Sequence, residues 1–215
     1  LNVTGVQTCA LPICKQTMKF PKWAIAVAVI VLLAIWGISK YNGLVTIDQN
    51  VKNKWSQVEN QYQRRSDLIP NLVNVVKGYT SHERETLEGV INARSKATST
   101  TINANDMDEA ALKRFQQNQD ALSSALSRLM VVVEKYPDLK ANEQFRDLSS
   151  QLEGTENRIT TARRDFNDAA QQYNTHRNKF PTVIVAGLAG FRERPYFTAQ
   201  AGSEVAPTVD FSTEK

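Results

Sequence analysis

The side chains able to support catalysis or bind a metal are few and far apart in this sequence. The two histidines, His82 and His176, do not form the His-x-x-x-His or Glu-x-x-His pairs that build metal sites on facing helices. We expect His82 to lie in the solvated first turn of a helix and His176 to be half-buried near the end of a helical bundle. The carboxylates Glu83, Glu85 and Glu88 fall within one helical run and predict a solvated face.

Motifs for cofactor chemistry are also missing. The sequence has no G-x-x-x-x-G-K-[ST], G-x-G-x-x-G, G-x-S-x-G or H-E-x-x-H pattern, so it predicts no phosphate cradle, dinucleotide site, serine nucleophile or zinc site. Both cysteines, Cys9 and Cys14, precede the first apolar run, which leaves the rest of the chain without a thiol. We predict a non-enzymatic protein with no cofactor, no metal and no identified small-molecule substrate.

A basic and aromatic motif near the C-terminus is the candidate interaction site. It follows the apolar segment TVIVAGLAG and contains Arg192, Arg194, Tyr196 and Phe197. These residues could hold a protein partner or a lipid headgroup, or they could form a strap that docks on the protein's own bundle. We favour the strap.

Two similar polar clusters occur on predicted helices, one around Glu59 and Arg65 and one around Glu156 and Arg163. Arg65 and Thr155 fall on otherwise apolar helical stripes. They predict a buried polar layer, with Glu59 or Glu156 facing an arginine, and such layers serve structural specificity more often than function.

The elements that carry these residues begin with an apolar run, residues 23–38, which contains no charge. Sixteen helical residues rise about 24 Å, and a bilayer core is about 30 Å thick, so flanking residues must extend the span. Aromatic residues near both ends are typical of membrane interfaces. We predict a retained anchor at 18–40; the alternative is a cleaved signal peptide, which would need an A-x-A-like site after the apolar run, and residues 37–40 contain no A-x-A pattern. The candidate anchor residues are Trp23, Ile30, Leu33, Trp36 and Ile38.

Charge is distributed unevenly along the chain. Residues 40–215 carry all 22 acidic residues and all but three of the 26 Lys and Arg. A nearly neutral body with interleaved signs argues against nucleic-acid binding. The lysines on the two sides of the apolar run almost balance, so the positive-inside rule leaves the orientation in the membrane open.

Residues 1–17 show no helical or strand periodicity, and Met18 follows them. We expect translation to start at Met18 and the preceding residues to be a non-native leader.

Beyond the anchor, apolar residues recur at spacings of three and four, which predicts long helices. Pro70 interrupts the first of them and leaves two possibilities, a kinked helix or a break between two helices. A second long helix is expected to end at Pro137 and the last to begin at Asp138. The last helix has the most regular stripe: Phe145, Leu148, Leu152, Thr155, Ile159, Ala162, Phe166, Ala169, Tyr173, His176 and Phe180.

The predicted fold is therefore all-α, with an N-terminal transmembrane helix followed by an elongated antiparallel bundle of three to four long helices. The bundle is expected to span residues 41–181, and residues 182–215 to form a C-terminal strap and flexible tail.

Several long motifs resemble the LemA family. They are YNGLVTIDQNVKNKWSQVENQYQRRSDLIPNLVNVVKGY (41–79), HERETLEGVINAR (82–94), LSRLMVVVEKYPDLKANEQFRDLSSQLEGTENRITTARRDFNDAAQQYN (126–174), FRERPYF (191–197) and VDF (209–211). The resemblance implies a single N-terminal transmembrane helix, a helical-bundle body, a bacterial membrane location and no established catalytic activity.

From these features we predict a single-pass protein of the bacterial cell membrane. It would act as a non-catalytic scaffold or assembly module through association with itself or with another membrane protein at the lipid bilayer. Two alternatives remain at this stage: a signalling or envelope-stress accessory protein that transmits strain through Pro70, and a ligand-binding bundle.

Overall fold

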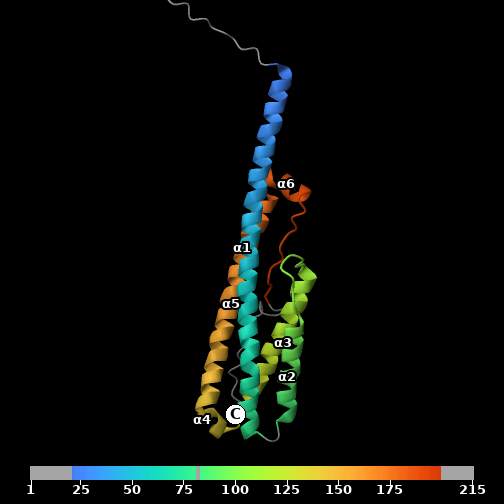
Figure 1. The fold of residues 1–215 in the computed structure, drawn as a ribbon. Coiled ribbons are helices and arrows are strands. Elements are labelled where there is room, and N and C mark those ends of the chain that lie inside the picture. Colours follow the sequence, from blue (N-terminus) through green and yellow to red (C-terminus); the bar gives the residue numbers. More distant parts are fainter. Residues whose placement is uncertain (1–20, 81–82, 200–215) are drawn as a thin grey trace, which may run out of the picture. The chain divides into compact units, whose positions relative to one another are not determined.

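The computed structural model describes residues 21–80 and 83–199, and every regular element in these ranges is a helix. The fold class predicted from the sequence is confirmed: a long apolar N-terminal helix is followed by further long helices that pack together. The chain divides into two units, residues 1–39 and 40–215. In chain order, the helices are α1 (Lys22–Tyr79), α2 (Arg84–Ser99), α3 (Glu109–Val133), α4 (Pro137–Ala141), α5 (Glu143–Asn178) and α6 (Thr182–Leu188) (Figure 1).

The first unit contains the start of α1. By length and composition, this part of the helix is long and apolar enough to cross a membrane. The predicted anchor residues all lie in it and are all exposed: Trp23, Ile30, Leu33, Trp36 and Ile38.

The second unit is a four-helix bundle in which α1, α2, α3 and α5 alternate in direction (Figure 1). Of the two possibilities at Pro70, the structure has a single helix, because α1 continues through it. Pro70 has no N–H to donate to the carbonyl of Ser66, four residues earlier. Arg94 Nε of α2 donates to that carbonyl at 2.8 Å instead. A neighbouring helix thus satisfies the acceptor that the proline leaves free.

Two helix boundaries differ from the sequence prediction. The last long helix begins at Glu143, not at Asp138, because Asn142 adopts an extended conformation and its Oδ1 accepts a hydrogen bond from the Phe145 N–H at 2.9 Å. Asp138 lies in the short helix α4. The helix before it ends at Val133, short of Pro137.

The apolar stripe of α5 is also shorter than predicted. Its members from Phe145 to Tyr173 are buried, but Phe180 lies beyond the end of α5 and is 81% exposed. Pro181 accounts for this difference, since it disfavours the helical conformation at the preceding residue.

The core consists of two apolar clusters. We call one the helical half, because all its side chains come from helices, and the other the strap half, because it includes Phe197 of the C-terminal strap. The helical half has its side chains on α1, α2, α3, α4 and α5: Ile69, Leu72, Val73, Val76, Leu87, Val90, Ala97, Leu122, Leu126, Leu129, Val133, Leu139, Phe145, Leu148 and Leu152. The strap half draws on α1, α3, α5 and α6 and also on non-helical residues: Leu44, Val51, Trp55, Val58, Tyr62, Ile102, Met107, Leu112, Phe115, Ile159, Ala162, Phe166, Ala169, Ala170, Tyr173, Ala186 and Phe197.

Candidate functional site

The segment after α6, residues 190–199, forms a strap along α5. Gly190 starts it with a φ of +76°, a left-handed conformation that suits glycine at the end of a helix. Side chains then bind the strap's backbone: Arg177 Nε donates to the Phe191 carbonyl at 2.9 Å, and the Tyr173 hydroxyl donates to the Arg192 carbonyl at 2.8 Å. Burial raises the pKa of Tyr173 above its ordinary value.

Two asparagines of α5 each form a pair of hydrogen bonds with one strap residue. Asn174 donates to the Arg194 carbonyl and accepts from its N–H, at 2.8 and 2.9 Å. Asn167 binds Phe197 in the same way, at 3.0 and 2.9 Å. Seven helical residues rise about 10.5 Å, and three extended residues span about 10 Å, so the two spacings match. The side-chain amides thereby fix the register of the strap.

Arg194 is the polar centre of this site. Its Nε and Nη2 donate to Asp48 Oδ1 of α1 at 3.1 and 2.6 Å, and its Nη1 donates to the Ala104 carbonyl at 2.7 Å. Both charged side chains are largely buried, and Lys52 adds a second cation 2.9 Å from Asp48 Oδ2. The pair therefore links three segments of the bundle: α1, the α2–α3 loop and the strap.

Phe197 is the apolar centre of the site. Its ring is buried, stacks on Trp55 at 6.1 Å between centroids and meets Phe166 edge-on at 5.5 Å. The guanidinium of Arg163 covers it at 4.7 Å. Phe197 thus fills the strap half of the core from outside the helices.

The four residues of the sequence-predicted interaction site consequently have different surroundings. Arg194 and Phe197 contact the protein's own bundle, whereas Arg192 and Tyr196 expose much of their side chains. The structure brings all four onto the strap. Binding of a partner or a lipid headgroup by this motif stays a prediction.

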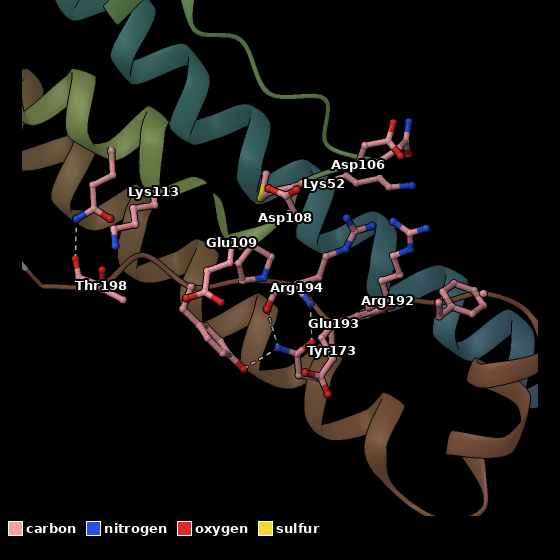
Figure 2. A pocket seen from close by; sticks show the side chains of 18 residues that line it. Lys52, Asp106, Asp108, Glu109, Lys113, Tyr173, Arg192, Glu193, Arg194 and Thr198 are labelled. Carbon is pink, nitrogen blue, oxygen red and sulfur yellow. Dashed lines mark hydrogen bonds between the residues drawn. The ribbon is translucent and has the colours of Figure 1, made fainter. Parts of the chain in front are cut away.

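A cleft of about 890 Å³ opens beside the strap (Figure 2). Lys52 of α1, Asp108 and Lys113 near the start of α3, and Arg192 and Glu193 of the strap contribute charges of both signs to its wall. The residues lining the cleft include no serine, cysteine or histidine.

Asp48 and the two asparagines were missed as site residues in the sequence analysis. Asp48 has a recognisable signal, because Leu44, Asp48, Val51 and Trp55 share one helical spacing and all are buried. A carboxylate on a buried stripe requires a cationic partner. Asn167 and Asn174 bind backbone groups, and the sequence pattern contains no signal for that role.

The predicted polar layer lies between the two apolar clusters. Arg65 is fully buried, and its Nη1 donates to Glu156 Oε1 at 2.7 Å and to Ser123 Oγ at 2.8 Å. Its Nη2 donates to Gln119 Oε1 at 2.5 Å. Of the two carboxylates considered, Glu156 is the partner. Burial raises the pKa of Glu59, the other one.

The remaining candidates for chemistry are not assembled into a site. His176 is partly buried near the end of α5, while His82, Cys9 and Cys14 fall outside the described residues, as do Met18 and the tail from residue 200. In the ranges 21–80 and 83–199, no three His, Cys, Asp or Glu side chains cluster in a way that could hold a metal ion.

Fold and site together define an all-helical bundle protein whose C-terminal strap completes its core. The chain belongs to the LemA family, whose model matches residues 54–211.

Individual relatives are similar at modest identity. Magnetosome protein MamQ 2 of Paramagnetospirillum magneticum is 26% identical over 178 residues, which cover 74% of this chain and 65% of that protein. Magnetosome protein MamQ of Magnetospirillum gryphiswaldense is 26% identical over 191 residues, covering 81% and 70%. Protein LemA of Metamycoplasma hominis is 26% identical over 149 residues, covering 69% and 64%. The chain thus spans about 65% of the length of the first of these relatives, and none of their names states a reaction.

Proposed function

We propose that this protein is a membrane-anchored, non-catalytic scaffold or assembly protein of the bacterial envelope. It would act near the bilayer by associating with itself or with another membrane protein. The observation that carries the proposal is the start of α1, where a run of large apolar side chains is exposed. Exposed apolar surface on this scale is costly in water and is typical of a segment that lipid covers.

The bundle supports a structural role. Its helices present mostly polar outer faces, and the buried Arg65 layer favours one register of the helices over others. Hydrogen bonds that hold the helices in one arrangement are compatible with a scaffold. Two of the similar proteins are named as magnetosome proteins, which is consistent with a structural role.

The structure gives less support to the signalling alternative. The signalling alternative requires α1 to flex at a kink at Pro70. The helix continues through this residue, and the bond from Arg94 to the Ser66 carbonyl braces it there.

Membrane fractionation combined with crosslinking tests the proposal. The wild-type protein should remain in the membrane pellet after carbonate extraction, and crosslinking in native membranes should capture a second copy or a recurrent membrane partner. Ile30→Lys with Leu33→Lys should release the protein, because each lysine at the centre of a membrane helix costs about 2.5–3.5 kcal/mol.

The matched control is Val131→Lys on α3, which also places a charge at an exposed apolar position but outside the anchor. It should leave the protein in the pellet. A protein that crosslinks to nothing in its own membrane would contradict the assembly role, and one that carbonate extracts would contradict the anchor.

A further inference from the structure

Helix α6 has an unusual distribution of apolar residues. Its inner face, Thr182 and Ala186, is buried against the bundle, whereas its outer face is also apolar. Leu188 on the outer face is 87% exposed, and Phe180, just before the helix, is 81% exposed. Val183 and Ile184 complete the exposed face. A short helix that packs only against its own bundle would turn polar residues outward.

Charged residues stand before and after the segment that contains α6, and none lies within it. Residues 180–191 contain no charged side chain, and exposed Lys179 and Arg192 flank them. An apolar segment between basic residues suits the boundary between acyl chains and anionic headgroups, where apolar side chains insert and basic ones contact phosphate.

The position of α6 within the second unit matches this chemistry. Phe191, which ends the segment, contacts Tyr41 of α1 with ring centroids 5.7 Å apart, and Ala186 belongs to the same core cluster as Leu44. Tyr41 follows the last candidate anchor residue, Ile38, by three positions in one helix. The other end of α1, Tyr79, lies about 57 Å farther along the helix axis. Within the second unit, α6 therefore lies at the end of the bundle that contains Tyr41 and Leu44, the first turns of α1 in this unit.

We infer that α6 and Phe180 form a second membrane contact, which inserts into the interfacial region of the bilayer. The inference rests on the proposed function, since it requires residues 23–38 to lie in the membrane. One attachment point leaves a bundle free to tilt and rotate. A second one, linked through Gly190 to the strap, fixes which face of the bundle is turned toward the lipid.

A bilayer fits this surface better than a second copy of the chain does. The exposed face comprises Phe180 and three residues of a seven-residue helix, and a stable protein interface needs about 800 Å² on each partner. Insertion into lipid has no such requirement for area or shape complementarity, because apolar side chains contribute one by one.

A fluorescent depth probe tests the inference in the whole chain. Cys9 and Cys14 are replaced by Ser, and one cysteine is introduced by Leu188→Cys and labelled with an environment-sensitive dye. The protein is reconstituted in phosphatidylethanolamine–phosphatidylglycerol vesicles without spin-labelled lipids or with lipids spin-labelled near the headgroup end and near the middle of the acyl chain, so that both shallow and deep positions can be quenched. Leu33→Cys in the anchor serves as the positive control and Val131→Cys, exposed on α3, as the negative control.

The label at position 188 should be quenched several-fold by the spin-labelled lipid, as at position 33, while the label at 131 should be unaffected. Ile184→Asp in the Leu188→Cys chain should bring quenching down to the level at 131. Ile91→Asp, a matched change on the exposed face of α2, should leave it unchanged.

The outcomes separate the two proposals. Quenching at 33 without quenching at 188 overturns the contact of α6 and leaves the anchor intact. No quenching at either position overturns both. A dye at 188 that is shielded from water but insensitive to the spin-labelled lipid, and that becomes exposed as the protein is diluted in the membrane, identifies a second copy as the occupant and overturns the lipid contact.

Discussion

The two halves of the core are closed by different kinds of element: helices in one, a loop and the strap in the other. In the helical half, side chains of α2 share one cluster with side chains of α1, α3, α4 and α5, and helical side chains alone close the core. In the strap half α2 has ended, and Ile102 and Met107 of the loop and Phe197 of the strap take its place. A helix contributes a periodic stripe with its backbone hydrogen bonds already made. A loop and a strap contribute single side chains, and side chains from elsewhere must satisfy their backbone groups.

This difference predicts two kinds of local stability. Elements with few buried residues and backbone bonds to side chains open more easily than packed helices. The strap depends on Phe197, on Arg194 and on four bonds from two asparagines. We therefore expect the strap to detach without unfolding the helical half.

The largest expected effect comes from removing one buried ring or one buried leucine. Phe197→Ala and Leu129→Ala should each lower the free energy of unfolding by about 3–4 kcal/mol, since both leave cavities in a packed core. The location of the effect should differ. Hydrogen exchange in the detergent-solubilised protein should show that Phe197→Ala exposes mainly the amides of Arg194 and residue 197, whereas Leu129→Ala speeds exchange throughout the bundle.

If Phe197→Ala reduced protection from hydrogen exchange equally in α2 and in the strap, the two halves would open as one unit. That result would contradict the predicted difference in local stability.

The helical half could be predicted from the sequence better than the strap half, because a helix leaves a periodic pattern in the sequence and single side chains of a loop or strap do not. Regular spacing revealed the stripe of α5 from Phe145 to Tyr173, and a polar residue on such a stripe revealed Arg65 and its layer. Helix boundaries were less certain, because the cap at Asn142 competes with the helix signals at Pro137 and Asp138. The pairing of Arg194 with Asp48 joins residues 146 positions apart, and no local period encodes such a contact.

The next largest effect should follow from removing the buried charge of the strap. Arg194→Met keeps the length of the side chain but leaves Asp48 with Lys52 as its only charged partner within salt-bridge distance among the described residues. Breaking one partner of a buried ion pair costs about 3–5 kcal/mol, and the remaining lysine should reduce this to about 2–3 kcal/mol. Denaturant unfolding measures the loss, and exchange of the Phe197 amide reports detachment of the strap.

Asp48→Asn in the same chain provides the matched test. If the cost of Arg194→Met comes from the stranded carboxylate, the double variant should recover part of the stability. No recovery would assign the cost to packing and to the lost bond with the Ala104 carbonyl.

A smaller effect is expected in the helical half, where Arg94 compensates for Pro70. Arg94→Met should cost about 1–2 kcal/mol, because the Ser66 carbonyl loses its donor. In a Pro70→Ala chain the new N–H can bond to that carbonyl, so the same change should cost much less. Unfolding of the four proteins in a double-mutant cycle measures the coupling. Additive effects would mean that the bond from Arg94 has no connection with the proline.

The smallest effect should arise at Glu59, at the boundary between the halves. Glu59 borders a small cavity of about 100 Å³ with Tyr62, Ala97 and Gln119, where α2 ends and the loop begins. Burial raises the pKa of this carboxyl, so its charged form is less favourable in the folded protein than in the unfolded chain. The folded state therefore loses stability as the pH rises from the ordinary carboxyl pKa through the raised one.

Glu59→Gln should be slightly more stable than the wild type at neutral pH, and the difference should vanish below the ordinary pKa. Glu153→Gln, at an exposed position of α5, controls for the loss of one surface charge. If the difference in the free energy of unfolding between Glu59→Gln and the wild type did not change with pH, it would come from packing at the end of α2. The charge of Glu59 would then have no effect on stability at the boundary between the halves.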